Sequence, residues 1–297
     1  MNQTPTFTIT DDDPELLKRL HIKPPISWPV VAILAVTLPL ALFLIVAVTC
    51  EWINPVLAAI PGALIGYYLF TPIHEAVHRS ASNNEKINDL LAMLTINLLL
   101  PYISPKALRW GHMQHHRFTN EVGKDPDASL THRWYSYLLW PFFELSYLPA
   151  YFRVAKQRPK SEVRQIILQL PLGAAALAIL FWFCGWKLFV FWFLASRMGL
   201  ALIVLVFVYL PHHPHTILQK DDFYGATMLR DGWEWLLTPL MMGQNWHLVH
   251  HIYPTIPFYR LKKAWYARAE FHESKNPARV NAFSLQAKEP RPSQPHL

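Results

Sequence analysis

The sequence predicts an all-α, polytopic membrane protein in which four transmembrane helices form two hairpins beneath a cytoplasmic helical cap. Charged residues make up 16% of the 297 residues and hydrophobic residues 52%, whereas soluble domains average about 25% charged residues. A bilayer core needs roughly 20 consecutive apolar residues per helix, and four runs of the chain meet this requirement. They are residues 28–50, 55–73, 166–184 and 188–210.

The distribution of basic residues predicts how these helices cross the membrane. Residues 51–54 and 185–187 form short turns that join the helices in pairs, so every longer connection lies on the opposite side. Lys187 falls in one turn and Arg197 within a span, and the rest of the 27 Lys and Arg residues fall on the other side. Because cytoplasmic loops carry the excess of Lys and Arg, we expect both termini and the long loops in the cytoplasm.

The remaining segments complete one membrane-embedded domain, expected over residues 28–272. Residues 1–27 and 273–297 are polar and predict a polar N-terminal tail and a loose C-terminal tail. Residues 90–100 are apolar but too short to cross a bilayer, which predicts a segment in the membrane interface. Residues 134–151 are rich in Trp, Tyr and Phe, as is typical of an aromatic belt at the headgroup level.

Three short histidine clusters are the strongest functional signal in the sequence. Residues three and four positions apart lie on one face of a helix, so each cluster directs two or three imidazoles to one point. The predicted topology places all three clusters on the same side of the membrane, where they can meet. The clusters are His74 and His78 in HEAVH, His112, His115 and His116 in HMQHH, and His247, His250 and His251 in HLVHH.

These imidazoles predict a site for two metal ions. Neutral imidazole is the commonest metal ligand in proteins, but one zinc ion usually takes four ligands. Zn, Cu, Fe and Ni all bind imidazole, so the ligand type alone does not identify the metal. Two sites of five or six ligands with open positions fit non-haem iron better than structural zinc. Reading HEAVH as the zinc-protease motif HExxH would leave six histidines unused.

Other polar residues near the clusters are candidate ligands or supporting groups. One histidine of the segment HHPH is expected to add a ligand, with His212 and His215 ahead of His213. Asn245, two residues before His247, is a candidate ligand either directly or through water. A carboxylate that accepts the second ring N–H of a ligating histidine fixes the orientation of that ring. The candidates for this role are Glu75, Asp125, Asp127 and Asp231.

The composition also excludes other classes of site. Cys50 and Cys184 are the only cysteines, which excludes a zinc ribbon, a CxxC redox motif and a thiolate-bound iron–sulfur cluster. The net charge of +7 does not indicate nucleic-acid binding, because the basic residues border the membrane spans. Residues 260–268 mix basic and aromatic side chains, which is typical of contact with anionic lipid. The same residues are a candidate docking surface for an acidic electron donor.

The three clusters resemble the histidine boxes of the membrane fatty acid desaturase superfamily, which includes hydroxylases and ketolases. The resemblance covers roughly residues 60–265. NWHLVHHIYPTIPFYR is similar to the third-box region of bacterial and cyanobacterial β-carotene hydroxylases, and YLPHHP and KDPD are similar to segments of β-carotene ketolases. HEAVH departs from this branch, whose first box more often contains HD, and that departure leaves acyl-chain substrates open.

The resemblance implies a di-iron centre, four transmembrane helices and oxygen-dependent attack on unactivated C–H bonds of a long apolar lipid. By position, the eight box histidines are implied as iron ligands, with His212 as the extra one. We expect carotenoid-ring hydroxylation in a bacterial inner membrane, with desaturation or hydroxylation of a fatty acyl chain as the alternative. A histidine-rich metal transporter or sensor is the alternative from a different class.

The implied reaction also needs electrons from outside the chain. The sequence contains no Gly-rich nucleotide fingerprint and no appended haem domain. A separate donor such as a ferredoxin or a rubredoxin is therefore expected to dock on the cytoplasmic face.

Overall fold

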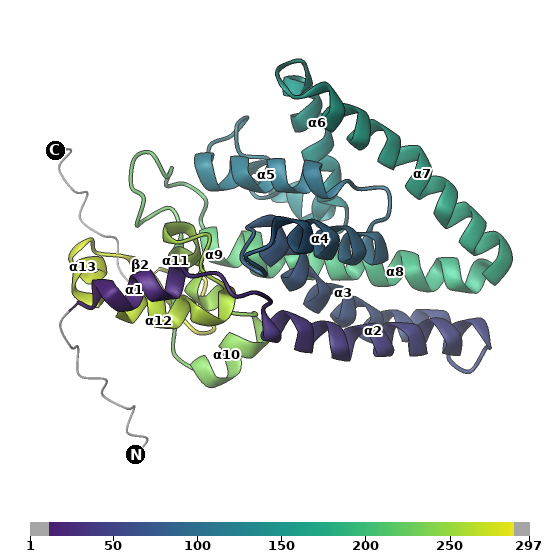
Figure 1. The fold of residues 1–297 in the computed structure, drawn as a ribbon, viewed down its shortest axis with the longest axis horizontal. Coiled ribbons are helices and arrows are strands. Elements are labelled where there is room, and N and C mark those ends of the chain that lie inside the picture. Colours follow the sequence, from purple (N-terminus) through teal and green to yellow (C-terminus); the bar gives the residue numbers. More distant parts are fainter. Residues whose placement is uncertain (1–11, 288–297) are drawn as a thin grey trace.

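The computed structural model describes residues 12–287, and it confirms a mostly helical fold. Among these residues, four helices are long and apolar enough to cross a membrane, and they coincide with the four apolar runs (Figure 1). They are α2 (Trp28–Thr49), α3 (Pro55–Val77), α7 (Lys160–Cys184) and a continuous run, Trp186–His212, that contains α8 (Trp186–Ile203), the π-helical η4 (Val204–Tyr209) and α9 (Leu210–His212).

α3 is the central helix of the membrane-spanning part and packs against both α2 and α8. Asn54 caps its first turn by accepting a hydrogen bond from Val56 N at 2.9 Å. Apolar side chains from the three helices form a shared buried cluster, which includes Leu44, Ala59 and Phe191. This packing holds α3 in place along its length, and its C-terminal turn carries the first histidine cluster.

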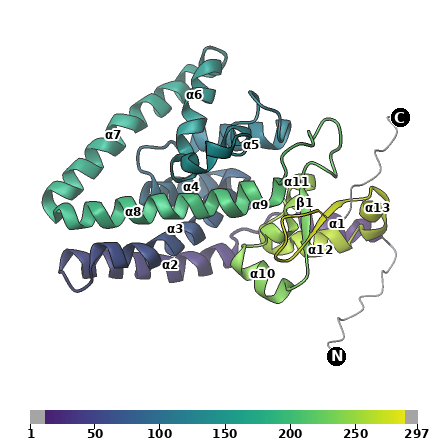
Figure 2. The same cartoon turned by 180° about the vertical axis from the view of Figure 1, so that it is seen from behind.

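The second pair of spanning helices does not form the tight hairpin that the sequence predicts. α7 and α8 meet at Gly185, whose φ of +83° allows the sharp turn, and they then diverge (Figure 2). The segment that connects α3 to α7 packs against α7, where Gln169 Nε2 donates a hydrogen bond to Pro101 O. This contact links α7 to the connecting segment.

The connecting segment between the two helix pairs is mostly helical. Residues 90–99 belong to a 15-residue helix that packs on α3 and is shorter than the roughly 20 residues a span requires. The next helix carries the second histidine cluster, and the aromatic stretch folds into short helices. The elements are α4 (Glu85–Leu99), α5 (Pro105–Phe118), η1 (Asp127–Leu130), η2 (Trp134–Phe142), α6 (Glu144–Val154) and η3 (Ala155–Gln157).

Short elements after His212 form a compact cap at one end of the spanning helices (Figure 1). They are β1 (Met228–Asp231), α10 (Glu234–Leu240), η5 (Gln244–Trp246), α11 (His247–Ile252), η6 (Phe258–Arg260), α12 (Leu261–Tyr266), α13 (Ala269–Ser274) and β2 (Ala278–Asn281). β1 and β2 pair in parallel, with Met228 opposite Ala278. This two-stranded sheet is a small addition to the mostly helical fold and gives residues 278–281 a fixed place.

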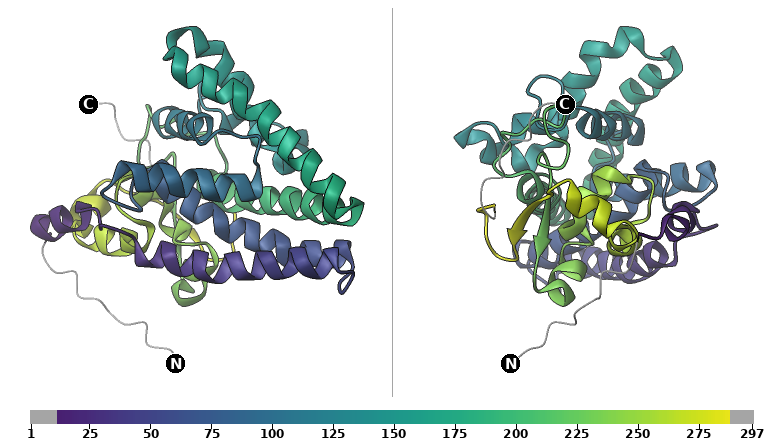
Figure 3. Two further views of the ribbon diagram at one scale, coloured as in Figure 1. Left: turned by 45° about the vertical axis from the view of Figure 1, so that its right-hand side comes forward. Right: turned by 90° about the vertical axis from the view of Figure 1, so that its left-hand side faces the viewer.

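The polar segment before α2 is also more ordered than its composition predicts. α1 (Pro14–His21) is capped by Asp13, whose side chain accepts a hydrogen bond from Leu16 N at 2.8 Å. Leu20 packs among buried apolar residues of the cap, and Arg260 donates hydrogen bonds to Leu20 O and Ile22 O. Figure 3 shows α1 lying along the cap, next to α12. The outer parts of both predicted tails lie outside the described residues.

Candidate metal centre

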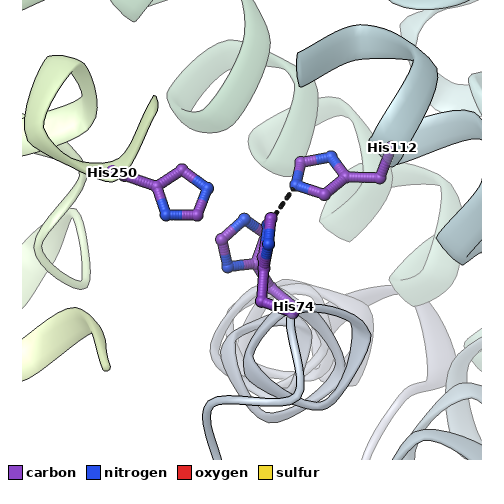
Figure 4. Close-up of side chains that lie close together, drawn as sticks. His74, His112 and His250 are labelled. Carbon is purple, nitrogen blue, oxygen red and sulfur yellow. Dashed lines mark hydrogen bonds between the residues drawn. The ribbon is translucent and has the colours of Figure 1, made fainter. Parts of the chain in front are cut away.

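The three histidine clusters meet in one buried region where the connecting segment and the cap both approach the end of α3. His112 from α5 and His250 from α11 point toward His74 on α3 (Figure 4). The eight histidines of the three clusters come from α3 and the residue that follows it, from α5 and from α11. His212 joins them from α9 at the end of the fourth span.

Four of these histidines form a first group whose ligand nitrogen atoms all lie within 4.8 Å of one another. The members of this first group are His74, His78, His112 and His250, and all are buried. The Nε2 atoms of His112 and His78 are 2.7 Å apart. His116 lies beside the group, with its Nε2 atom 3.2 Å from His112 Nε2 and 3.0 Å from His250 Nε2. Five imidazoles therefore surround one point.

A second buried group satisfies the same distance limit. The members of this second group are His115, His212, His247 and His251. His247 Nε2 lies 3.1 Å from His212 Nε2 and 3.2 Å from His251 Nε2. The six-residue π-helical segment η4 shifts the register of the fourth span just before His212. The structure thus brings together all three predicted clusters and the first histidine of HHPH.

Buried ring nitrogens without a partner show that the site fits metal ions. Both nitrogens of His74 and Nε2 of His115 are buried and have no hydrogen-bond partner among the described residues. Buried polar atoms are normally paired, so these atoms are suited to a ligand. Neighbouring imidazoles in both groups point their Nε2 atoms toward one another. Two nitrogen lone pairs at such distances repel each other unless they share a proton or bind a cation.

The protonation state of the imidazoles also favours metal binding. Burial, reinforced by the neighbouring imidazoles, holds the pKa of five of them well below the usual value of 6.5, so that these rings are neutral near pH 7. Neutral imidazole is the form that binds a metal ion. The five are His112, His116, His247, His250 and His251.

Hydrogen bonds to the second ring nitrogen orient two members of the second group. His247 Nδ1 contacts Gln244 Oε1, and His212 Nδ1 lies 3.1 Å from Ala226 O. Because both partners are acceptors, they place the ring proton on Nδ1 and leave the Nε2 lone pair for a metal ion. Gln244 was not predicted from the sequence, although its position three residues before His247 on a helical turn is a usable signal.

Two predicted carboxylates lie beside His115. Its Nδ1 atom is 3.1 Å from Asp125 Oδ2 and 3.5 Å from Asp127 Oδ2. Burial alone would lower the pKa of His115, but the two carboxylates outweigh it and raise the pKa to about 9. Backbone N–H groups of Asn120 and Asp127, each at 2.9 Å, hold the Asp125 carboxylate in place. This is the geometry that a supporting role requires.

The other two predicted carboxylates are engaged elsewhere. Glu75 Oε2 accepts hydrogen bonds from Ser80 Oγ at 2.9 Å and from Phe258 N at 3.2 Å, whereas the nearest His74 nitrogen is 4.0 Å from its carboxylate. Glu75 points about a quarter turn away from His74 on the helix, and it ties residue 258 to α3. Asp231 lies on β1, outside both histidine groups, and its carboxylate pairs with Arg279 at 2.7 Å.

The remaining candidate ligands also lie outside the two groups. His213 and His215 flank the Tyr209 ring, with centroids 5.1 and 5.5 Å away, because the chain turns after His212. Asn245 is buried and donates a hydrogen bond from Nδ2 to Thr238 Oγ1 at 3.1 Å. Its Oδ1 atom has no hydrogen-bond partner among the described residues, so an open acceptor remains at this position.

A family comparison matches the same region of the chain. Residues 50–281 match the model of the family described as "Fatty acid desaturase". The chain therefore belongs to the fatty acid desaturase family, which confirms the resemblance carried by the histidine boxes. It is a membrane-bound oxidoreductase, and the enzyme prediction is confirmed over the metal transporter or sensor.

Individual relatives within this family include several lipid desaturases. The chain is 22% identical over 279 residues to sphingolipid delta(4)-desaturase DES1 of Drosophila melanogaster, covering 90% of this chain and 81% of the relative. It is 25% identical over 239 residues to the sn-1 acyl-lipid omega-3 desaturase (ferredoxin) of Synechocystis, covering 71% and 66%. A 42% identity to beta-carotene 4-ketolase 3 of Haematococcus lacustris extends over only 60 residues, or 20% of this chain and 18% of the relative.

Proposed function

We propose that this protein is an oxygen-dependent di-iron enzyme that desaturates or hydroxylates the acyl chain of a membrane lipid. One observation carries the proposal: two adjacent groups of buried imidazoles converge in a member of the fatty acid desaturase family. The first group and His116 together offer five imidazoles to one ion. That number favours iron over structural zinc, which takes four ligands.

The comparisons favour an acyl chain over a carotenoid ring as the substrate. Two relatives that match 90% and 71% of the chain are named for desaturation of a sphingolipid and of an acyl lipid. The match to a beta-carotene ketolase is confined to a fifth of the chain. Carotenoid-ring hydroxylation, which the sequence motifs favoured, therefore becomes the second candidate, and its support is that short match of 42% identity.

The residues of this chain would hold the metals and keep water away from them. Iron bound at the two groups would supply the reductive activation of oxygen that an unactivated C–H bond requires. The first group and His116 would hold one ion, and the second group would hold the other. The rings of Phe70 and Phe207 cover His74 on the side of the spanning helices, with centroids 6.1 and 5.4 Å away, and they exclude water there.

A large apolar cavity beside the metal centre suits a long acyl chain. It has a volume of about 1050 Å³ and lies between α2, α3 and the cap. Its α2 wall runs from Pro29 to Leu44, a helical length of about 22 Å. Histidines do not line it, but three lining residues adjoin the site: Thr238 is bonded to Asn245, Phe258 is bonded to Glu75, and Trp246 precedes His247. We propose that a lipid acyl chain enters through this cavity.

The location of the site and its electron donor are part of the same proposal. The distribution of Lys and Arg supports a cytoplasmic metal site and cytoplasmic termini, and we propose a bacterial inner membrane as the location. The Synechocystis relative is named as a ferredoxin enzyme, which supports a ferredoxin or rubredoxin donor here. Residues 260–268 are a weaker docking candidate than the sequence suggested, because Arg260 binds the carbonyls of Leu20 and Ile22 and Arg268 pairs with Asp12.

Two expression hosts test the proposal. The full chain is produced in a host with defined acyl lipids and in a host that makes β-carotene, and the lipids and pigments are analysed by mass spectrometry. We expect acyl chains that have lost two hydrogens or gained one oxygen, together with two irons per chain in the purified protein. Oxygen added to the pigment alone would support the second candidate. Zinc, or no metal, in an inactive protein would contradict both.

A further inference from the structure

Tyr147 on α6 makes a buried contact with the second carboxylate beside His115. Its side chain is 4% exposed, and its hydroxyl donates a hydrogen bond to Asp127 Oδ1 at 2.8 Å. The other oxygen of the same carboxylate, Oδ2, is the atom that lies 3.5 Å from His115 Nδ1. Tyr147 therefore holds one end of a carboxylate whose other end faces a histidine of the second group.

The two carboxylates that face His115 are held by different means. Asp125 is fixed by backbone N–H groups of its own loop. The Tyr147 hydroxyl, which reaches Asp127 from another helix, is the side-chain hydrogen bond that holds the Asp127 carboxylate in the described residues. His115 Nε2, at the far side of the ring, has no hydrogen-bond partner within residues 12–287 and belongs to the second group. The direction in which Nε2 points depends on how the two carboxylates hold Nδ1 of the same ring.

Contacts with α5 and α8 fix the position of α6 and of the Tyr147 ring. A Cβ atom at Gly111 would lie 2.4 Å from the ring, so a glycine one residue before His112 makes room for Tyr147 against α5. One turn earlier on α6, Glu144 Oε1 accepts a hydrogen bond from Arg197 of α8 at 2.7 Å. Arg197 is the one charged residue that the sequence places within a predicted span, and its buried ion pair with Glu144 fixes α6 to that span.

We propose that Tyr147 is a positioning residue for the second metal ion. It holds the Asp127 carboxylate beside His115, so that the ring keeps its proton on Nδ1 and directs Nε2 into the second group. The Arg197–Glu144 ion pair holds α6 at the depth that this contact requires. The inference rests on the proposed function, because it assumes that the second group binds a metal ion.

A pair of matched tyrosines on α6 provides the test. Tyr147→Phe removes only the hydroxyl and keeps the ring against Gly111. Tyr151→Phe is the control. Tyr151 is also buried, and its hydroxyl donates a hydrogen bond to Glu162 Oε1 at 2.7 Å. Glu162 belongs to neither histidine group. Purified full-length proteins in detergent are titrated anaerobically with ferrous iron against a chelator. Thermal unfolding without metal checks the fold of each variant.

The expected result is a loss of affinity at one iron site only. Losing a group that supports a metal ligand typically weakens metal binding about 10–100-fold, so Tyr147→Phe should bind its second iron about 10-fold more weakly. Tyr151→Phe should bind both irons as the wild type does. Asp127→Asn should weaken the same site, and the double variant Tyr147→Phe/Asp127→Asn should be no weaker than Asp127→Asn, because the two residues act in series.

Two outcomes would overturn the inference. Tyr147→Phe could retain the iron affinity of Tyr151→Phe, or the effects of Tyr147→Phe and Asp127→Asn could add in full. A wild-type protein that binds no pair of irons would instead refute the proposed function, and the role of Tyr147 would fall with it. The wild-type titration therefore distinguishes failure of the proposed function from failure of the inference.

Discussion

His116 Nε2 lies 3.0 Å from His250 Nε2, although the two residues are 134 positions apart in the sequence. His116 lies on α5 in the connecting segment, and His250 lies on α11 in the cap. Two separate parts of the chain therefore reach the same site. Two ring nitrogens at this separation can share one proton or point toward one cation. The contact joins the second and third histidine clusters, and its stability depends on what occupies that space.

Replacing His116 tests whether the ring beside the first group is essential. We expect His116→Ala to abolish the lipid product and to lower the iron content of the purified protein, because one of five converging nitrogens is lost. The product is measured by mass spectrometry of the host lipids. His132→Ala is the control, since His132 is exposed and lies outside both histidine groups. Full product formation by His116→Ala would refute a ligand role for this residue.

The metal-free protein should lose stability as the pH falls. The pKa values of His112, His116, His247, His250 and His251 are lowered by burial, so the unfolded state binds more protons below pH 6.5. Their contribution to stability is present above that pH and is lost as the pH falls through and below it. His115, with a raised pKa of about 9, acts in the opposite direction and loses its contribution as the pH rises from 6.5 toward 9.

Thermal unfolding of the metal-free protein in detergent, from about pH 8 to about pH 5, measures the sum of these effects. Because the imidazoles with a lowered pKa outnumber the groups that act in the opposite direction, such as His115 and Asp127, we expect the unfolding temperature to fall toward the acidic end. Saturating iron should reduce this dependence near neutral pH, since bound metal stabilises the neutral form of its ligands. An unfolding temperature that rises toward pH 5 would contradict the burial of neutral imidazoles.

The parts of this structure that the sequence predicts are those with a repeating local pattern. Long apolar runs identify the four spans, and i, i+3, i+4 histidines identify the faces that meet. Asp125 follows the second cluster closely enough to be a candidate supporting group, and the structure places it 3.1 Å from His115. In each case, the prediction depends only on residues that are close together in the sequence.

Contacts between distant polar segments have no such pattern and were not predicted. Residues 14–21 look like part of a polar tail, but Leu20 is buried in the cap and Arg260 donates a hydrogen bond to Leu20 O. Asp231 is close to the third cluster in sequence, yet the pairing of β1 with β2 directs it to Arg279. Tyr147 was one of many aromatics in its segment, and only the fold shows that it reaches Asp127.

Removing Arg197 should destabilise the protein much more than removing an exposed basic partner. Arg197 and Glu144 form a buried ion pair with side chains 9% and 2% exposed. Leaving one partner of such a pair alone costs about 3–5 kcal/mol, so Arg197→Met should clearly lower the free energy of unfolding in detergent. Lys187→Met is the control, because the Lys187–Glu51 pair at 2.8 Å is more exposed and contributes about 0–1 kcal/mol.

The double variant Arg197→Met/Glu144→Gln separates charge from packing. If the cost of Arg197→Met comes from an unpaired buried carboxylate, neutralising Glu144 should restore part of the lost stability. No recovery in the double variant would show that the other contacts of the Arg197 side chain stabilise this part of the protein: its hydrogen bonds to Pro141 O and Tyr102 and its position over Phe142 and Phe193.

Narrowing the large cavity should change which acyl chains are oxidised without affecting the metal site. Leu40 on α2 lines the cavity and is 48% exposed, whereas Leu38 on the same helix is 40% exposed and does not line it. Leu40→Trp places an indole in the path proposed for the acyl chain. We expect about a 10-fold shift in preference toward shorter chains, read from the chain lengths of the oxidised lipids, with the iron content unchanged. Leu38→Trp should leave the preference as it is, because that side chain points elsewhere on α2. Equal product profiles for the two variants would show that the substrate does not pass through this cavity.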